Sequence, residues 1–310
     1  MTATQARPQV LRTPSRRRPR SLVVAVRPRQ WLKNVLVIGA PLAAGRLLQP
    51  RVSLDTAIAF VAMCLAASAT YLINDVHDAA EDRGHPRKRH RPVAAGDLSK
   101  AGALAAAAVL ALAGLAVAVL ASPAFALVVA AYLAMTLAYT IWLRGEPVVE
   151  LVVVAAGFVL RGAAGGVAAG LAVSSWFLLV AGFGSLFLVS GKRYAERVGA
   201  DDRDGVRVRT TLSVYTPSFL RFVWTSAATL TIACYALWAS QVYLVRDEGS
   251  WALLSLAPFL LALLRYALDL DRGTAEAPEE VLLHDRALLI LGLVWIAMLA
   301  VGAGGFDLGL

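Results

Sequence analysis

Stretches of about 20 mostly apolar residues recur along this chain, and each is long enough to cross the hydrocarbon core of a bilayer as an α-helix. A spanning segment must satisfy its own backbone polar groups, so it is either a helix or part of a closed barrel. The alternating strands of a barrel are absent from the sequence. We therefore expect an all-α polytopic membrane protein, a bundle of about nine transmembrane helices, with spans near 31–48, 54–73, 101–120, 124–143, 147–171, 174–191, 217–243, 251–270 and 287–306.

The composition agrees with lipid as the solvent. Of the 310 residues, 58% are hydrophobic and only 16% are charged, which is more apolar than a typical soluble domain. The net charge of +9 would suggest nucleic acid if the chain were soluble, but the cations gather in a few loops between apolar spans. We therefore exclude nucleic acid as a partner and expect lipid headgroups and phosphorylated ligands.

The loops that hold most of the Lys and Arg residues lie between the second and third spans and between the sixth and seventh. The positive-inside rule places both loops in the cytoplasm, which puts the amino terminus inside and the carboxyl terminus outside. Residues 1–26 are basic and poor in apolar side chains, so we expect a disordered cytosolic tail. Residues 27–310 are expected to form a single transmembrane catalytic domain.

An acidic run, residues 74–82, directly follows the second predicted span. Asn74, Asp78 and Asp82 are spaced i, i+4, i+8 and share one face if the helix continues; Asp75 lies off that face. Carboxylates this close repel one another unless a hard cation lies among them, and Mg²⁺ is held by one or two carboxylates, waters and phosphate oxygens. We therefore predict a Mg²⁺ site with Asn74, Asp75, Asp78 and Asp82 as ligands. The alternative is a solvated acidic helix end.

The Asn-Asp-x-x-Asp-x-x-x-Asp pattern at the end of a predicted membrane helix resembles the UbiA superfamily of intramembrane prenyltransferases. Residues 27–34 (RPRQWLKN), 82–96 (DRGHPRKRHRPVAAG) and 191–196 (GKRYAE) resemble its decaprenyl-phosphate phosphoribosyltransferase branch. The resemblance covers nearly the whole chain after the tail. It implies an enzyme in which Asn74, Asp78 and Asp82 are catalytic, and in which Lys33 and Asn34 face the same pocket.

Lys192, Arg193 and Tyr194 follow the sixth predicted span, where typical members of the superfamily carry a second pair of acids. Cations at this position suggest that the pocket receives negative charge directly, because Lys and Arg form charge-assisted hydrogen bonds with phosphate. Phosphoribosyl pyrophosphate has two separated phosphate groups and fits, whereas a prenyl diphosphate has no second group. The alternative is that these residues only enforce topology.

Arg161 lies inside an apolar span, where a charge is costly unless it faces a polar cavity or partner. Glycines around it allow close helix approach. We assign Arg161 to the substrate pocket and leave a structural ion pair with Glu150 as the alternative. The remaining candidates for phosphate binding lie in the loop after the second span and are Arg83, Lys88 and Arg91.

Together these residues and the resemblance predict Mg²⁺-dependent transfer of 5-phosphoribosyl from phosphoribosyl pyrophosphate to polyprenyl (decaprenyl) phosphate. The products are decaprenylphosphoryl-5-phosphoribose, for cell-wall arabinan synthesis, and diphosphate. We expect a bacterial inner membrane protein with its active site on the cytoplasmic side. The sequence does not decide whether the protein forms a homo-oligomer. The runner-up is transfer of a prenyl group from a prenyl diphosphate to an aromatic acceptor. A transporter is a further alternative, and it would be expected to contain two repeated halves with interrupted helices. A membrane scaffold without chemistry is another alternative, and it would not need the acidic residues of the run 74–82.

Overall fold

The computed structural model describes residues 18–86, 88–201, 210–245, 250–273, 281 and 284–302. Within these ranges every regular element is a helix and no strand occurs. Seven helices are long and apolar enough to cross a membrane, and α15 is a shorter apolar helix. The all-α prediction is therefore confirmed for a multi-pass membrane protein, while the count of nine spans stays a prediction. Residues 1–17 of the expected tail lie outside the described part of the chain.

The long helices begin at ordinary start signals. Ser99 and Ser122 accept hydrogen bonds from backbone amides in the first turns of α6 and α7, and Pro50 occupies the first turn of α3, where its missing N–H costs nothing. The apolar helices are α3 (Pro50–His77), α6 (Lys100–Ala121), α7 (Pro123–Ile141), α8 (Val149–Ala168), α9 (Ser175–Asp201), α11 (Pro217–Val245), α12 (Ser250–Leu254) with α13 (Leu256–Asp271), and α15 (Arg286–Gly302).

The segment expected to be the first span differs from a regular α-helix. In place of residues 31–48 the chain forms a 3₁₀ helix, η1 (Pro28–Ile38), followed by the short α2 (Gly39–Ala43). A 3₁₀ helix is narrower than an α-helix and rises more per residue, so η1 can lie with its backbone against α8. The contact is closest at Gly165, where a Cβ would sit 2.0 Å from the carbonyl oxygen of Val37.

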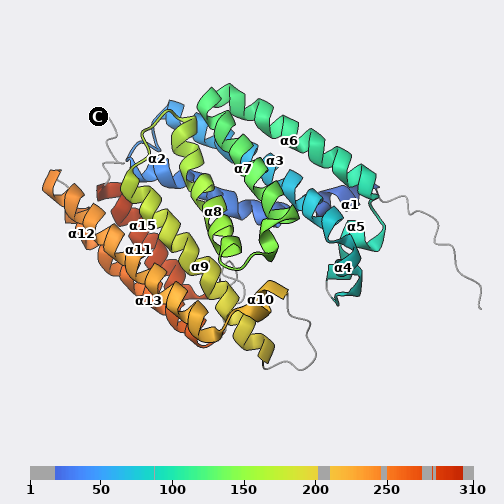
Figure 1. The fold of residues 1–310 in the computed structure, drawn as a ribbon. Helices are drawn as coiled ribbons and strands as arrows, with labels where there is room; N and C mark the ends of the chain where they lie inside the picture. Colours follow the sequence, from blue (N-terminus) through green and yellow to red (C-terminus); the bar gives the residue numbers. More distant parts are fainter. Residues whose placement is uncertain are drawn as a thin grey trace, which may run out of the picture.

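Helix α8 joins two groups of helices (Figure 1). On one side it packs against α3, α7 and η1, with a core that includes Met63, Phe125 and Tyr132. On its other side α8 packs against α9, which belongs to a second group with α11 and α13, whose core includes Phe187 and Trp224. Any displacement of α8 would therefore disturb its packing against both groups of helices.

The short helices gather mainly beside the end of α3, and we call this end of the bundle the acidic end because Asn74, Asp75, Asp78 and Asp82 lie there. Figure 1 shows α4 and α10 projecting at this end. The connection between α7 and α8 contacts α10, so it belongs to the same region. The short elements are α1 (Arg18–Ala25), α4 (Ala79–Gly84), η2 (Lys88–His90), α5 (Pro92–Ala95), η3 (Leu143–Gly145) and α10 (Thr210–Val214).

Replacing Gly165 by Ala should lower the stability of the protein, because the added Cβ would meet the backbone of η1. Overpacking of this kind costs about 1–3 kcal/mol, and we expect a lower midpoint of thermal unfolding in detergent. Gly292→Ala in α15 is the matched control, since a Cβ there meets nothing within 4 Å. Equal unfolding midpoints for the two variants would show that η1 does not lie against α8 this closely.

Candidate active site

The predicted one-turn spacing of Asn74, Asp78 and Asp82 is present in the backbone. The amide of Asp78 donates to the carbonyl of Asn74, and the amide of Asp82 donates to the carbonyl of Asp78, each at 2.9 Å. The helix is interrupted between these residues, however, because α3 ends at His77 and α4 begins at Ala79. The interruption separates the three side chains, which have different partners.

Asp75 and Asp82 form one half of the site, and both are almost fully buried, at 1% and 3% exposed. Nη1 of Arg91 lies 2.7 Å from Oδ2 of Asp82 and 3.4 Å from Oδ1 of Asp75. Arg27 donates a hydrogen bond to Oδ1 of Asp75, while Oδ2 of Asp75 is buried with no hydrogen-bond partner among the described residues. Asp75 therefore shares one cation with Asp82 and is not a solvated residue beside the motif.

Arg27 reaches Asp75 from an unusual backbone position. Its φ of 54° and ψ of 64° lie in the left-handed region, at the point where α1 gives way to η1. A side chain other than Gly is uncommon there and costs conformational energy. Its guanidinium also lies 5.2 Å from the ring centre of Tyr71, in cation–π geometry. The ion pair and the ring together offset that cost.

Asp78 forms the other half of the site with the loop after α7. Its Oδ1 accepts a hydrogen bond from Arg144 and lies 3.0 Å from Nδ1 of His77. Burial raises the pKa of Asp78, but these two contacts outweigh burial and hold its pKa below the usual value. Arg144 also lies 3.6 Å from Glu81. Asp78 is therefore a carboxylate at neutral pH, stabilised by a cation that is not part of the acidic run.

Asn74 is oriented by α7, because its side-chain oxygen accepts a hydrogen bond from Thr140. Asn74 and Asp78 thus face α7 and η3, whereas Asp75 and Asp82 face Arg27 and the loop that carries Arg91. The acidic run is divided between two neighbouring clusters.

Arg144 is a site residue that the sequence analysis did not identify. The available signal was its position in the short gap between the fourth and fifth predicted spans, which the positive-inside rule places on the same side as the acids. Its carbonyl accepts a hydrogen bond from Thr211 of α10 at 2.9 Å. Arg144 therefore links the end of α3 to α10.

The loop after Arg144 contains a strained turn. Val148 has a φ of 66° and a ψ of −49°, and the amide of Val149 donates to the carbonyl of Pro147 at 2.8 Å, which closes a γ-turn. The amide of Val148 donates to the hydroxyl of Tyr215 at 2.7 Å. Burial raises the pKa of Tyr215, which keeps the phenol protonated. Tyr215 thus fixes the start of α8.

Arg193, predicted to bind phosphate, is engaged by carboxylates. It makes two parallel hydrogen bonds of 2.9 Å to Glu150 of α8 and one of 2.9 Å to Glu196. Arg193 and Glu150 are 11% and 3% exposed. Lys192 is 38% exposed and lies 3.9 Å from Glu196. Tyr194 is buried, and its hydroxyl accepts a hydrogen bond from Arg221. Of these three predicted residues, only Lys192 has a substantially exposed charge.

Arg161 does not pair with Glu150, so that alternative is wrong. Arg161 is 8% exposed, and the partners described for it are neutral: Asn34 Oδ1 at 2.9 Å, the Gly157 carbonyl at 3.2 Å and the Tyr132 hydroxyl at 2.5 Å. Asn34 is fully buried. The network ties η1 to α7 and α8, so Arg161 and Asn34 position η1 rather than join the acids.

The other predicted phosphate-binding residues lie around the acidic end. Nε of Arg83 donates to the carbonyl of Ala94 at 3.3 Å, which connects α4 to α5. The amide of Lys88 donates to Nδ1 of His85 at 3.3 Å. Lys33 and Lys88 are both partly exposed. Arg91 contacts the acidic run directly, through Asp75 and Asp82.

The donor set fits a divalent cation that binds together with phosphate. Within the described residues, no three His, Cys, Asp or Glu side chains form a ready cluster for a metal. Mg²⁺ needs only one or two carboxylates when phosphate oxygens complete its coordination. Asp75 and Asp82 already converge on one cationic nitrogen of Arg91, and the unpartnered Oδ2 of Asp75 offers a further oxygen.

Comparison with known proteins identifies relatives along most of the chain. Residues 35–293 match the UbiA prenyltransferase family. The chain is 46% identical over 290 residues to a decaprenyl-phosphate phosphoribosyltransferase of Corynebacterium glutamicum, covering 92% of this chain and 87% of the relative. It is 49% identical over 282 residues to the protein of that name from Mycobacterium tuberculosis, covering 89% of this chain and 92% of the relative.

Solved structures show the same fold at low sequence identity. A UbiA homologue from Archaeoglobus fulgidus bound to DMAPP and Mg²⁺ matches with a TM-score of 0.68 at 16% identity, covering 92% of this chain and 99% of that chain. The same homologue bound to GPP and Mg²⁺ matches with a TM-score of 0.66 at 17% identity, covering 91% of this chain and 98% of that chain. The overall helical arrangement of the chain is thus shared with these solved structures.

Arg91→Gln should make the stability of the protein depend on Mg²⁺. Without the guanidinium, Asp75 and Asp82 face each other with less compensating charge, so the thermal unfolding midpoint should fall in EDTA and recover when Mg²⁺ is added. Arg89→Gln is the control, because Arg89 is exposed in the short helix η2, which directly precedes Arg91. A midpoint of Arg91→Gln that does not respond to Mg²⁺ would contradict a shared cation position.

Glu150→Ala and Arg193→Ala should each destabilise the protein by about 3–5 kcal/mol, because each leaves a buried charge without its main partner. The double variant should lose much less than the sum of the two, which a double-mutant cycle of unfolding free energies would measure. A different result would contradict this prediction: neither variant is destabilised, and only Arg193→Ala weakens binding of phosphoribosyl pyrophosphate. Arg193 would then bind phosphate and would not join α8 to α9.

Proposed function

Because the chain belongs to the UbiA prenyltransferase family, we propose that it transfers 5-phosphoribosyl from phosphoribosyl pyrophosphate to decaprenyl phosphate. It is a membrane enzyme that transfers a group. Relatives with 46% and 49% identity over about nine tenths of the chain are named for this phosphoribosyl transfer. The products are decaprenylphosphoryl-5-phosphoribose and diphosphate.

The observation that carries the proposal is the alternation of acids and arginines at the acidic end. Asp75, Asp82 and Asp78 are each paired with a guanidinium, from Arg27, Arg91 or Arg144. Carboxylates suit a divalent cation, and guanidinium groups suit phosphate oxygens. A site that holds both kinds of group in two neighbouring clusters is suited to a diphosphate bound with a metal ion.

We assign Asn74, Asp75, Asp78 and Asp82 as the residues that would hold Mg²⁺, which would neutralise charge on the departing diphosphate. Arg91 and Arg144 donate to the diphosphate oxygens once they leave the carboxylates, and their charge-assisted hydrogen bonds strengthen as the leaving group becomes more negative. Arg83, Lys88 and Lys192 are the further candidates to bind the donor, including its 5-phosphate.

The reaction breaks the bond between C1 of the ribose and the diphosphate oxygen, and that oxygen keeps the electron pair. A phosphate oxygen of the lipid forms the new bond to C1, where positive charge develops in the transition state. The nucleophile is already anionic at neutral pH, so no strong general base is needed. Positioning of the two substrates by the fixed loops at the acidic end supplies much of the rate.

We further propose that the acidic end faces the cytoplasm of a bacterial cell, where the donor is dissolved. Its connecting segments hold Lys88, Arg91 and Arg144, and Lys192 lies in the last turns of α9. Cytoplasmic segments of membrane proteins are rich in such cations. The lipid acceptor enters from the bilayer. The product would serve as a precursor for cell-wall arabinan.

Prenyl transfer to an aromatic acceptor is the second candidate, because solved homologues of the same fold bind GPP or DMAPP with Mg²⁺. The described end of α9 argues against it. Two carboxylates whose contacts are described near it, Glu196 on α9 and Glu150 on α8, are both engaged by Arg193, so these two are poorly placed to support further metal ions.

Purified protein in lipid nanodiscs with Mg²⁺ should release diphosphate from phosphoribosyl pyrophosphate only when decaprenyl phosphate is present, with the lipid product detected by mass spectrometry. Asp78→Ala and Asp82→Ala should each reduce turnover by about 100-fold or more. Asp97→Asn, an exposed acid in the following loop, should have little effect. Prenylation of 4-hydroxybenzoate from geranyl diphosphate, without phosphoribosyl transfer, would refute the proposal in favour of the second candidate.

A further inference from the structure

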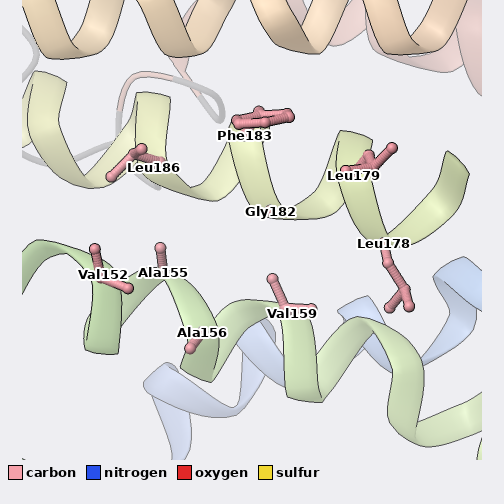
Figure 2. Close-up of a pocket in the computed structure, with 9 residues that line it drawn as sticks. All are labelled: Val152, Ala155, Ala156, Val159, Leu178, Leu179, Gly182, Phe183 and Leu186. Carbon is pink, nitrogen blue, oxygen red and sulfur yellow. The ribbon is translucent and has the colours of Figure 1, made fainter. Parts of the chain in front are cut away.

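An apolar groove of about 260 Å³ lies between α8 and α9 (Figure 2). Each residue that lines it is aliphatic, aromatic or glycine. Small residues on both helices, Ala155 and Ala156 on α8 and Gly182 on α9, leave the space open. The groove therefore offers only dispersion and hydrophobic contacts to whatever occupies it.

The groove opens toward the lipid. Val152 on α8 and Leu178 and Leu179 on α9 line it and are themselves exposed. Both helices belong to the segments long and apolar enough to span a membrane. An apolar chain in the bilayer can therefore enter the groove from the side without crossing water or a polar surface.

At the acidic end, the two helices that form the groove carry charge. Leu179, Leu186 and Arg193 recur along α9 at helical spacing and share one face, and Arg193 meets Glu150 of α8. Leu186 precedes Arg193 by seven positions, roughly 10 Å along the helix axis. Lys192, with its exposed ammonium, lies beside this pair. Arg193 is neutralised by its carboxylates, whereas Lys192 stays 38% exposed at 3.9 Å from Glu196. An apolar track that ends near this exposed ammonium matches a lipid with an anionic head.

We propose that this groove binds part of the isoprenoid chain of the acceptor lipid, with the phosphate of the lipid directed toward the acidic end. The inference rests on the proposed phosphoribosyl transfer and adds the binding site of the acceptor tail. Its volume of about 260 Å³ is slightly below the usual range for ligand pockets, so it holds a segment of a long polyprenyl chain and leaves the remainder in the bilayer.

Gly182 allows the groove to be filled without disturbing the helices. A Cβ at this position would meet only Cγ2 of Val159, at 3.9 Å, which is ordinary van der Waals contact. Gly182→Leu therefore places most of its side chain in the groove, and it also removes a glycine from the middle of a helix. Gly292→Leu in α15 is the matched control, because a Cβ there meets nothing within 4 Å.

In nanodiscs, Gly182→Leu should lower the ratio of kcat/KM for decaprenyl phosphate to that for farnesyl phosphate by about tenfold, because the long chain loses apolar contacts that the short chain makes less fully. The KM for phosphoribosyl pyrophosphate should not change, and Gly292→Leu should leave the ratio as in the wild type. An unchanged ratio in Gly182→Leu would overturn the proposal. So would a change in oligomeric state, which would make the groove a contact between copies of this chain.

Photo-crosslinking tests the same groove without turnover. A polyprenyl phosphate with a diazirine on its third isoprene unit should label peptides that contain residues 152–159 and 178–186, and unlabelled polyprenyl phosphate should compete. If added phosphatidylglycerol abolished the labelling as effectively as unlabelled polyprenyl phosphate does, the groove would be a site for bulk lipid and the proposal would be overturned. Failure of phosphoribosyl transfer in the wild-type protein would instead refute the proposed function, so the two failures are distinguishable.

Discussion

The arrangement of the acidic end depends on one constraint, which is that carboxylates buried at the end of a membrane helix require a cation beside each of them. Asp75, Asp78 and Asp82 satisfy it with guanidinium groups from three separate parts of the chain. Arg27 precedes η1, Arg91 precedes α5, and Arg144 lies between α7 and α8. Three connections are thereby fixed to the end of α3, so the charges that hold the local fold are the same ones that the proposed reaction uses.

Two further arginines, both largely removed from solvent, show different solutions to the same problem. Arg193 is paired with Glu150 in a bidentate ion pair that joins α8 to α9. Arg161 instead has neutral partners from η1, α7 and α8, which spread its charge over several dipoles. Both arginines act on α8, the helix between the two groups. The position of α8 is therefore fixed from both sides, and with it the groove that α8 shares with α9.

The sequence predicted the features that depend on local patterns. Long apolar stretches predict membrane helices, and the spacing of Asn74, Asp78 and Asp82 predicts the one-turn repeat seen in the backbone. The sequence did not predict that the first expected span is a 3₁₀ helix, because this conformation depends on contact with Gly165 in a distant helix. It also missed the pairing of Glu150 with Arg193, since no sequence period relates residues on different helices.

The pairing at the acidic end has an energetic consequence for the proposed reaction. A diphosphate brought alone into this region would meet three carboxylates, and a divalent cation brought alone would meet three guanidinium groups. Each would be repelled by half of the site. When the diphosphate and the cation bind together, the contact partners can be exchanged. The carboxylates would then contact the metal in place of the arginines, and the arginines would contact the phosphate in place of the carboxylates. The number of opposite-charge contacts is then kept, which makes joint binding more favourable than binding of either species alone.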